Sequence, residues 1–375
     1  MRNMKNLYIL ITVCFIFSDC TSKKSENAFR QFDVSTNYPE KKIFLEEIAE
    51  IEYLQLKMDD DFLFASAPHI VTSKKIILSQ DGDVLIFSRN GEPLSKFNRK
   101  GNGPGEYTYI RKLLFDETTD EFFLHVGDKI FIYSSSGDFK RSIPLPDRME
   151  DIFCQFVNYD SKCLLLYNDF DVYPNPFTFI SKVDGRVVDS IMLPKGNYLE
   201  RYASSGDYIF YAPSYWIVKH HNGYILTDYS IDTVYLFSHD KKLSPILERK
   251  PHIQSMDPII YLNSFVEAGN YEFVSAITVK SENGQRLPRK YLMRDKKSGT
   301  VYRQNITFKD YIGKQVYISP ETIENTQDDK LGLIILDMFE LKEANNEKKI
   351  SGILKDLVES SDDEDNSIFM LLHFK

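Results

Sequence analysis

The residues with the clearest potential for chemistry lie in a glycine-rich segment, Lys100-Gly101-Asn102-Gly103-Pro104-Gly105-Glu106-Tyr107. Three glycines in five residues indicate a backbone that needs positive φ or a close approach to another group. Charged and aromatic side chains flank these glycines, and a few polar groups at a concave site are what a ligand usually meets. The candidate ligand-binding residues are Arg99, Lys100, Glu106, Tyr107 and Arg111.

The same segment excludes two nucleotide-binding motifs. A phosphate loop ends in Gly-Lys-Ser/Thr before a helix, whereas Tyr107–Arg111 reads as a strand. The glycines fall at 101, 103 and 105, which is not the spacing of a dinucleotide-binding fingerprint. A purely structural interpretation stays open, in which Tyr107 packs on the fold and Glu106 pairs with Arg99 or Arg111.

Histidines form a second candidate group, because imidazole is a common zinc ligand. The chain has seven, at positions 69, 125, 220, 221, 239, 252 and 373. Several fall in different repeats, but His239 and His220-His221 read as turn residues, and no Gly-x-Ser-x-Gly, His-Glu-x-x-His or zinc-type cysteine motif is present. With 55 Asp and Glu, the sequence selects no catalytic pair of carboxylates. We therefore expect no metal and no cofactor, name no catalytic residue, and favour a binding role over an enzymatic one.

Aromatic residues offer a third kind of site. The chain is 14% aromatic, with 27 Phe and 23 Tyr, and residues 208–216 are the densest segment. A platform on which sugar rings could stack would draw on Tyr107, Tyr109, Tyr211, Tyr215 and Trp216. Burial in the core of the fold is the competing interpretation of the same residues.

These side chains must be positioned by strands, because an apolar run, a tight turn and a second extended run recur along the chain. The turns of five such units fall at residues 91, 137, 185, 240 and 299. A period of about 50 residues with several strands per unit is typical of a β-propeller. The predicted fold class is all-β, a six-bladed β-propeller whose N- and C-terminal strands share one blade.

The predicted blades span residues 62–97, 110–145, 152–193, 205–248 and 258–308. The sixth combines residues 315–337, Ile368–Phe374 and Ile43–Leu56, so that the first and last strands close the ring. Apolar residues recur at helical spacing in Lys348–Ser360, which predicts a short helix inserted in the last blade. Packing on the propeller and binding a partner both explain its apolar face.

The N-terminus reads as a targeting segment. Its apolar stretch Leu7–Phe17 follows basic residues, is too short to span a bilayer and has the length of a signal-peptide core. Cys20 follows, as in a bacterial lipobox, although Asp19 stands where a small residue is preferred. The domain prediction is a signal peptide at 1–19, a lipidated Cys20 with a flexible tether at 20–37, and the propeller at 38–375. Secretion without lipid and an N-terminal membrane anchor stay open.

Charge and cysteine content narrow the alternatives further. The formal net charge of -9 and the acidic run Asp362–Asp365 argue against a nucleic-acid partner, which requires a basic surface. Apart from Cys14 and Cys20, only Cys154 and Cys163 remain. Their spacing in a hairpin does not place them opposite each other, so we expect two buried thiols rather than a disulfide.

The glycine-rich segment also carries a family resemblance. Gly-x-Gly-Pro-Gly-Glu-Tyr, an apolar strand ending in Phe115-Asp116, and Lys129–Tyr133 before a Ser-Gly turn resemble an NHL-type repeat. With the Cys20 signal peptide and the closing helix, nearly the whole mature chain resembles the six-bladed, NHL-like or TolB-like β-propeller lipoproteins of gut Bacteroidetes. The other repeats lack the motif. The resemblance implies an envelope location in a family mostly without an assigned activity.

The expected function is that of an envelope-anchored binding or scaffold lipoprotein. The ligand would be a glycan, a peptide or an envelope protein, and the chain would contact the membrane only through its N-terminal lipid, at the outer membrane. Two alternatives stay open. One is an NHL-like propeller enzyme, a metal-dependent lyase or hydrolase, and the other is a structural subunit of an envelope complex.

Overall fold

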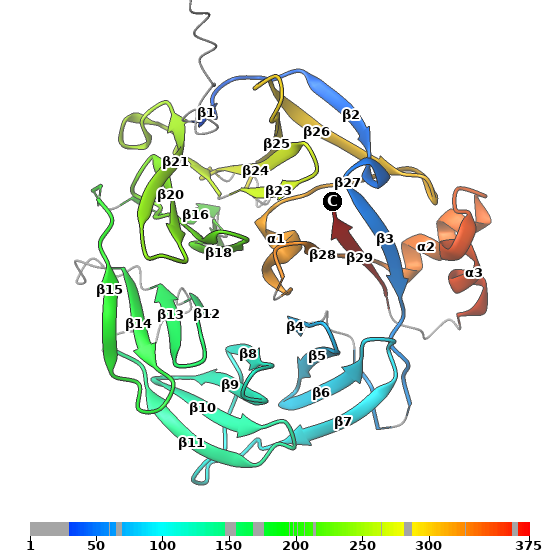
Figure 1. Cartoon of the computed structure of the whole chain (residues 1–375). Helices are drawn as coiled ribbons and strands as arrows, with labels where there is room; N and C mark the ends of the chain where they lie inside the picture. The colour runs from blue at the N-terminus through cyan, green and yellow to red at the C-terminus, as the bar shows by residue number, and fades with distance from the viewer. Residues whose placement is uncertain are drawn as a thin grey trace, which may run out of the picture.

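Strands arranged as a ring of sheets make up most of the molecule (Figure 1). The computed structural model describes residues 30–375 except 60, 65–69, 147–154, 168–175, 195, 198, 201, 206, 213–214, 264, 281–286, 327 and 362–366. In Figure 1 the ring is seen along its axis, so the predicted β-propeller is confirmed. The predicted signal peptide, the lipidated Cys20 and Cys154 lie outside the described residues.

The first three blades follow one another along the chain as four-stranded antiparallel sheets. Blade 1 contains β4 (Ile70–Val71), β5 (Lys75–Gln80), β6 (Asp83–Ser88) and β7 (Pro93–Asn98). Blade 2 contains β8 (Lys112–Asp116), β9 (Glu121–Val126), β10 (Lys129–Ser134) and β11 (Phe139–Pro144). Blade 3 contains β12 (Gln155–Asn158), β13 (Cys163–Tyr167), β14 (Phe177–Ser181) and β15 (Val187–Ile191).

Blades 4 and 5 each gain a parallel strand from the start of the chain. Blade 4 contains β18 (Ile217–His220), β19 (Gly223–Leu226), β20 (Thr233–Ser238), β21 (Leu243–Lys250) and β1 (Arg30–Asp33). Blade 5 contains β22 (Ile260–Leu262), β23 (Val266–Ala268), β24 (Tyr271–Thr278), β25 (Arg289–Asp295), β26 (Val301–Phe308), β27 (Tyr311–Val316) and β2 (Glu40–Phe44). Short 3₁₀ helices, η1 (Leu45–Glu47) and η2 (Ile253–Ser255), lie in the connections.

The ring is closed by a sheet that joins both ends of the chain (the closing sheet). It contains β28 (Leu331–Leu336), β29 (Ile368–Phe374) and β3 (Ala49–Leu54), with β29 antiparallel to both neighbours. The predicted sharing of one sheet by the N- and C-terminal strands is therefore confirmed. The predicted partner segment Ile43–Leu56 is divided, because its beginning belongs to β2, which pairs with β26 instead.

The predicted count of six blades needs correction. Five sheets of the described chain have the four or more strands of a complete blade, whereas the closing sheet has three. A fourth strand would lie just after β3. There the chain instead follows blade 1, with a hydrogen bond from Lys57 N–H to Gly91 O and edge contacts of Phe62 and Phe64 with Phe87. Side-chain packing against blade 1 replaces a strand ladder at this position.

Middle strands of the blades are continuous apolar runs, as expected for sheets that are covered on both faces. In β6, Val84, Leu85, Ile86 and Phe87 are at most 2% exposed. Leu164, Leu165 and Leu166 of β13 are fully buried. The packing between neighbouring blades therefore forms the core, and it extends around the ring.

The propeller begins earlier in the chain than the predicted residue 38, because strand β1 already belongs to it. This strand pairs in parallel with β21, and Phe32 and the following Val34 are fully buried. Residues 30–37 of the predicted tether are thus part of the propeller.

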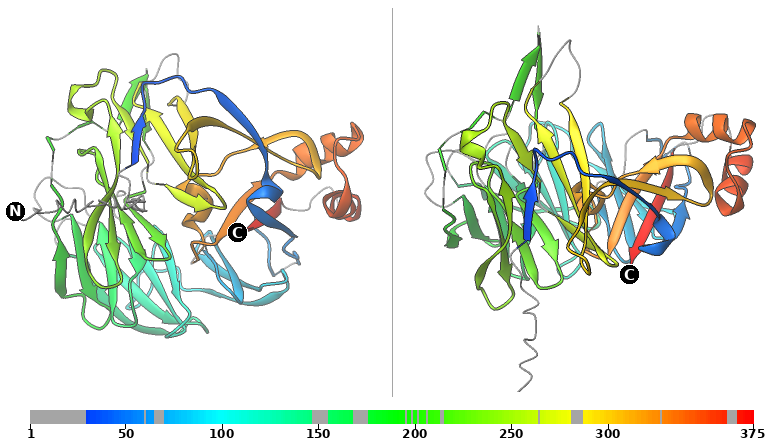
Figure 2. Two further views of the ribbon diagram at one scale, coloured as in Figure 1. Left: turned by 45° about the horizontal axis from the view of Figure 1, so that its top comes forward. Right: turned by 90° about the horizontal axis from the view of Figure 1, so that it is seen from above.

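Two helices stand out from the ring beside the closing sheet (Figure 2). They are α2 (Met338–Asn346) and α3 (Gly352–Ser360), both between β28 and β29, whereas one helix over Lys348–Ser360 was predicted. Leu354 and Val358 are buried in the core, which confirms the packing interpretation for this part of the apolar face, while Ile353 is 66% exposed. Among the described residues, no helix is long and apolar enough to cross a membrane.

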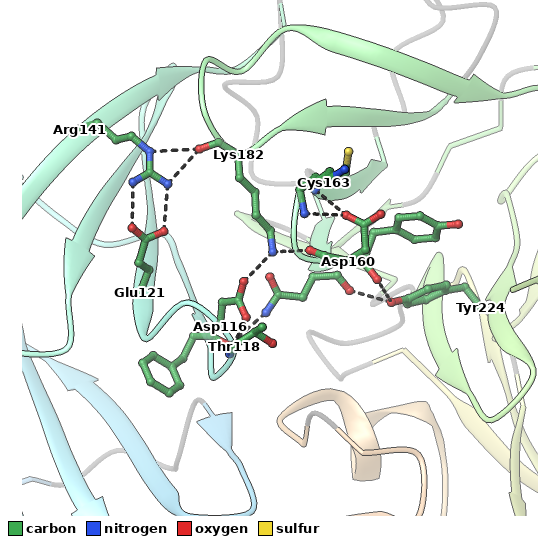
Figure 3. A network of polar contacts seen from close by, with 12 residues as sticks. Asp116, Thr118, Glu121, Arg141, Asp160, Cys163, Lys182 and Tyr224 are labelled. Carbon is green, nitrogen blue, oxygen red and sulfur yellow. Dashed lines mark hydrogen bonds and ion pairs between the residues drawn. The ribbon is translucent and has the colours of Figure 1, made fainter.

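Polar contacts connect neighbouring blades (Figure 3). Arg141 of β11 donates two hydrogen bonds of 2.9 Å to the Glu121 carboxylate and two more, of 3.0 and 3.1 Å, to the backbone oxygen of Lys182 in blade 3. Arg99, after β7, makes the corresponding contact between blades 1 and 2, from Nε to Gly137 O at 2.8 Å. Both arginines fix the turn of the next blade and hold the ring together.

Candidate functional site

A narrow cavity lies where the inner strands meet (the central cavity). It is bounded by β4, β8, β12 and β18, and by the short helix α1 (Pro320–Glu324) with the residues that follow it. Its volume is about 140 Å³, close to that of an engineered apolar cavity that holds one benzene molecule. The central cavity therefore has room for a small group of a ligand and not for a sugar chain or a peptide.

Polar side chains around the central cavity mainly hold the strands in place. The Gln155 amide donates to Ile217 O and accepts from Ile217 N–H, both at 2.9 Å, and so joins β12 to β18. Lys112 Nζ lies 3.4 Å from Glu324 Oε1 and joins β8 to α1. These contacts keep the central cavity narrow. A larger opening beside α1 is therefore the better candidate for a ligand site.

That opening is a groove beneath a two-stranded hairpin (the aromatic groove). The hairpin consists of β16 (Tyr202–Ser205) and β17 (Tyr208–Tyr211), inserted between blades 3 and 4. The groove has a volume of about 610 Å³, within the range of about 300–1,000 Å³ common for ligand sites. It is lined by Ile209, Phe210, Tyr211, Ile277, Leu287, Arg289, Tyr291 and Glu321.

The hairpin exposes aromatic side chains that its own sheet cannot bury. Tyr208 is 67% exposed and Tyr211 is 45% exposed. Tyr202 and Tyr211 face each other across the strands, with ring centroids 6.0 Å apart. Because an isolated two-stranded hairpin is marginally stable in water, and exposed apolar patches usually mark interaction sites, this hairpin has the character of a binding element.

A charged pair and Tyr291 form the opposite wall of the groove. Arg289 pairs with the Glu321 carboxylate of α1 and donates to Tyr291 Oη at 3.1 Å. Burial lowers the pKa of the Arg289 guanidinium, but the charge of Glu321 more than offsets this and the pKa is raised. Tyr291 stacks on Tyr317, with centroids 4.1 Å apart and rings inclined by 16°. The wall thus offers a fixed donor, a fixed acceptor and an aromatic face.

Tyr215 connects the aromatic groove with the central cavity. Its ring lines the cavity, and its hydroxyl interacts with Glu321 of the groove. Burial, together with the charges of Glu324 and Glu321, raises the pKa of this hydroxyl well above its usual value. Tyr215 therefore stays neutral and serves as a hydrogen-bond donor between the two spaces.

The glycine-rich loop gives three of the predicted site residues structural contacts. Tyr107 is fully buried, and its hydroxyl donates to Gly82 O at 2.7 Å while accepting from Arg99 N–H at 3.1 Å. The Glu106 carboxylate accepts from Gly103 N–H at 2.8 Å, and a Cβ at Gly101 would lie 2.0 Å from it. Gly101 is thus required because Glu106 folds back over its own loop.

The other two predicted site residues line a pocket beside that loop. Lys100 and Arg111 border a space of about 300 Å³ together with Tyr109. Arg111 donates to Tyr109 Oη at 3.2 Å. The ligand-binding role predicted for Arg99, Lys100, Glu106, Tyr107 and Arg111 stays a prediction, and the geometry favours Lys100 and Arg111 within this set.

The proposed aromatic platform is divided between core and surface. Trp216 and Tyr107 are buried, and the Trp216 ring stacks on Tyr167 at 4.5 Å. Tyr211 and Tyr109 are 45% and 46% exposed and line different pockets. Burial is therefore the correct interpretation for two of these residues, while Tyr211 belongs to the aromatic groove.

Sequence reasoning missed the wall of the groove. Its residues Arg289, Tyr291 and Glu321 come from blade 5 and the segment after it, far along the chain from the hairpin. The sequence does carry a signal for the inserted hairpin. The distance between successive turns is 48 residues from 137 to 185 but 55 residues from 185 to 240, the interval that contains the hairpin. The predicted fourth blade at 205–248 absorbed this insertion, whereas blade 4 begins at Ile217.

Histidines of the described chain do not line the central cavity. His125 is buried in β9, where burial lowers its pKa to about 4. His239, His252 and His373 lie at exposed positions, and His69 lies outside the described residues. The predicted thiol Cys163 is free and half-buried, and burial raises its pKa.

The fold and the groove define a β-propeller with a ligand-sized site at the face where several blades meet. The chain belongs to the family described as Domain of unknown function (DUF4934), which it matches over residues 29–373. No curated protein matches it in sequence.

Two solved structures show the same fold. A protein of Bacteroides fragilis whose name describes it as exported is 18% identical with a TM-score of 0.64, and the match covers 93% of this chain and 100% of that one. A DUF4221 family member of Bacteroides vulgatus is 11% identical with a TM-score of 0.51, over 88% and 97% of the two chains. These likenesses agree with the expected resemblance to Bacteroides propellers of unknown function.

Proposed function

We propose that this protein is an exported, lipid-anchored binding protein that holds a carbohydrate in the aromatic groove. Export is supported by the apolar N-terminal stretch Leu7–Phe17 and by the name of the similar B. fragilis protein. Cys20 is the proposed site of lipidation, and the outer membrane is the proposed location.

One observation carries the choice of ligand: the exposed Tyr211 of the hairpin lines the same groove as the fixed Arg289–Glu321 pair. A sugar ring presents an apolar face, which packs on an aromatic ring, and hydroxyls that both donate and accept hydrogen bonds. Tyr211 supplies the aromatic ring, Arg289 donates, and Glu321 accepts. A peptide would be better served by an open strand edge or a deep apolar pocket.

The central cavity adds a constraint on the size of the ligand. Because Tyr215 lines this cavity of about 140 Å³ and interacts with Glu321 of the groove, we propose that the cavity takes one substituent of a sugar bound in the groove. The protein would then bind an oligosaccharide along the groove, with one group pointing toward the axis.

A thermal-shift screen against host and plant oligosaccharides, with peptides as the competing class, tests this proposal. A ligand at about one hundred times its Kd adds roughly 2.7 kcal/mol of stability. We expect a shift with at least one oligosaccharide that is lost in Tyr211→Ala. Stabilisation by peptides alone, or a shift that Tyr211→Ala leaves unchanged, contradicts it.

A further inference from the structure

Two neighbouring histidines and a glutamate come together at the end of strand β18. His220 ends β18, His221 follows in the turn, and Glu267 lies on β23 of blade 5. In the described part of the chain, one metal-binding atom from each of these three side chains lies within 4.8 Å of the others. We call these residues the His–His–Glu cluster.

We propose that the His–His–Glu cluster binds a divalent transition-metal ion such as Zn²⁺. Two imidazoles and one carboxylate are a common zinc ligand set, and imidazole favours zinc, copper or nickel over calcium or magnesium. The three atoms need only small shifts to reach the spacing of metal ligands. His220 and His221 can make such shifts because they lie beside and in the turn between β18 and β19. This site was missed in the sequence because Glu267 lies 46 residues from His221.

The hydrogen bond of His220 must change for this imidazole to bind a metal. His220 Nδ1 accepts a hydrogen bond of 3.2 Å from Asn222 N–H. A metal on Nε2 would require the proton to move to Nδ1 and this long bond to be given up.

A fourth residue supports the orientation of His221. Its Nδ1 lies 3.5 Å from the Asp329 carboxylate, so Nε2 is the nitrogen that remains for a metal. A carboxylate on the second ring nitrogen is the usual partner of a zinc-bound histidine, because it fixes the ring and raises its basicity. Asp329 is thus a positioning residue.

Two cations oppose the bound ion and limit its affinity. Arg30 and Lys296 lie 3.6 and 3.7 Å from the two Glu267 oxygens, beyond ordinary hydrogen-bond distance, and the closer partner of Arg30 is Glu272. The lone pairs of Glu267 therefore stay accessible, but the positive charges lower the affinity for a divalent ion. We expect a Kd on the order of micromolar rather than nanomolar.

The cluster is separate from the aromatic groove. The cluster also lies outside the lining of the central cavity. That lining includes residues 217–219 of β18 and residues 325–326, but neither His220 nor Asp329. None of the cluster residues lines the groove. Metal binding and carbohydrate binding can therefore be tested, and can fail, independently.

Titration calorimetry of the untagged protein with ZnCl₂ tests the proposal. We expect one equivalent of Zn²⁺ to bind, and His221→Asn to weaken binding at least tenfold. Asp329→Asn should weaken it about 10- to 100-fold. The matched control is His252→Asn, which removes another exposed histidine that faces a carboxylate, Asp232 at 3.0 Å, and should leave binding unchanged.

Two results would overturn the proposal. One is the absence of binding at 100-fold the expected Kd, on the order of 100 µM Zn²⁺. The other is binding that persists in the double variant His220→Asn/His221→Asn. Melting curves in the presence of a chelator must coincide for wild type and His221→Asn, so that a loss of binding cannot be attributed to unfolding.

Discussion

Nζ of Lys182 lies 2.7 Å from Oδ2 of Asp116, and this ion pair joins blade 3 to blade 2 with both side chains at most 6% exposed. Lys182 Nζ also donates to Asp160 O at 2.6 Å (Figure 3). Burial raises the pKa of Asp116, but the hydrogen bond and charge of Lys182 outweigh it, so the pKa is lowered. The pair is charged and fully engaged, as a buried ion pair must be.

Removing one member of this pair should destabilise the fold strongly. Lys182→Met leaves the Asp116 carboxylate buried without its cation, which costs about 3–5 kcal/mol. The double variant Lys182→Met/Asp116→Leu should regain much of that loss, because no charge is left buried. Urea unfolding measures both free energies.

A more exposed pair provides the control. Lys75 Nζ lies 3.1 Å from Asp120 Oδ1, with the Asp120 side chain 57% exposed. Lys75→Met should therefore cost at most about 1 kcal/mol. If Lys182→Met and Lys75→Met lower the free energy of unfolding equally, the buried ion pair contributes no more to stability than the exposed one.

Acid should weaken the ion pair between Glu121 and Arg141 within blade 2, which also holds the Arg141 side chain that reaches Lys182 O in blade 3. The bidentate hydrogen bond from Arg141, with help from Lys140, lowers the pKa of Glu121 to about 2 despite burial. Because the native pKa lies below the unfolded value of about 4.5, the stabilisation is complete above that value and is lost as the pH falls toward 2. The full effect is about 3 kcal/mol.

Unfolding free energies of wild type and Glu121→Gln between pH 7 and pH 3 measure this effect. The difference between the two proteins should be largest at pH 7 and should shrink steadily below pH 5. A difference that is independent of pH would mean that the Glu121 carboxylate contributes no charge-dependent stability.

Much of the fold was predictable from local pattern. Apolar runs such as Val84–Phe87 marked the middle strands, because a strand covered on both faces must be apolar throughout. With the regular spacing of turns they placed blades 2 and 3 within a few residues, whereas the hairpin inserted before blade 4 displaced its predicted start. The parallel strand β1 was not predictable. Its sequence, Arg-Gln-Phe-Asp, is mostly polar, and its pairing with β21 across more than 200 residues leaves no local signal.

Strand β1 should be required for full stability. A chain that begins at residue 38 loses the fully buried Phe32 and Val34, and Arg30 no longer pairs with the buried Glu272. At about 1.5–3 kcal/mol for each buried apolar side chain, we expect a loss of about 3–6 kcal/mol. Calorimetric melting of chains that begin at residues 28 and 38 compares them directly, and identical Tm values would contradict the assignment of β1 to the fold.

The candidate site was harder to predict than the fold. Glycine spacing correctly pointed to a special backbone at residues 101–105, but it could not show that Glu106 binds its own loop. The groove depends on Tyr211 and Glu321, which the ring topology brings together across 110 residues of sequence. Such a site follows from tertiary structure, since neither segment carries a motif.

Tyr107 offers a test of the structural role of the glycine-rich loop. Tyr107→Phe removes the hydroxyl that bridges Gly82 O and Arg99 N–H, which should cost about 1–3 kcal/mol of stability. Ligand affinity should be unchanged, because the hydroxyl is buried. Chemical denaturation and a binding isotherm on the same variant separate the two effects, and a loss of affinity without a loss of stability would return Tyr107 to the binding site.

The most direct test of the central claim compares two equally exposed tyrosines in different pockets. Calorimetry should measure the affinity of the best oligosaccharide for wild type, Tyr211→Ala and Tyr109→Ala. Tyr211 lines the aromatic groove and Tyr109 the pocket of the glycine-rich loop. We predict that Tyr211→Ala weakens binding at least tenfold, about 1.4 kcal/mol, and that Tyr109→Ala changes it less than about twofold. The reverse order would contradict the assignment of the groove and place the ligand at the glycine-rich loop.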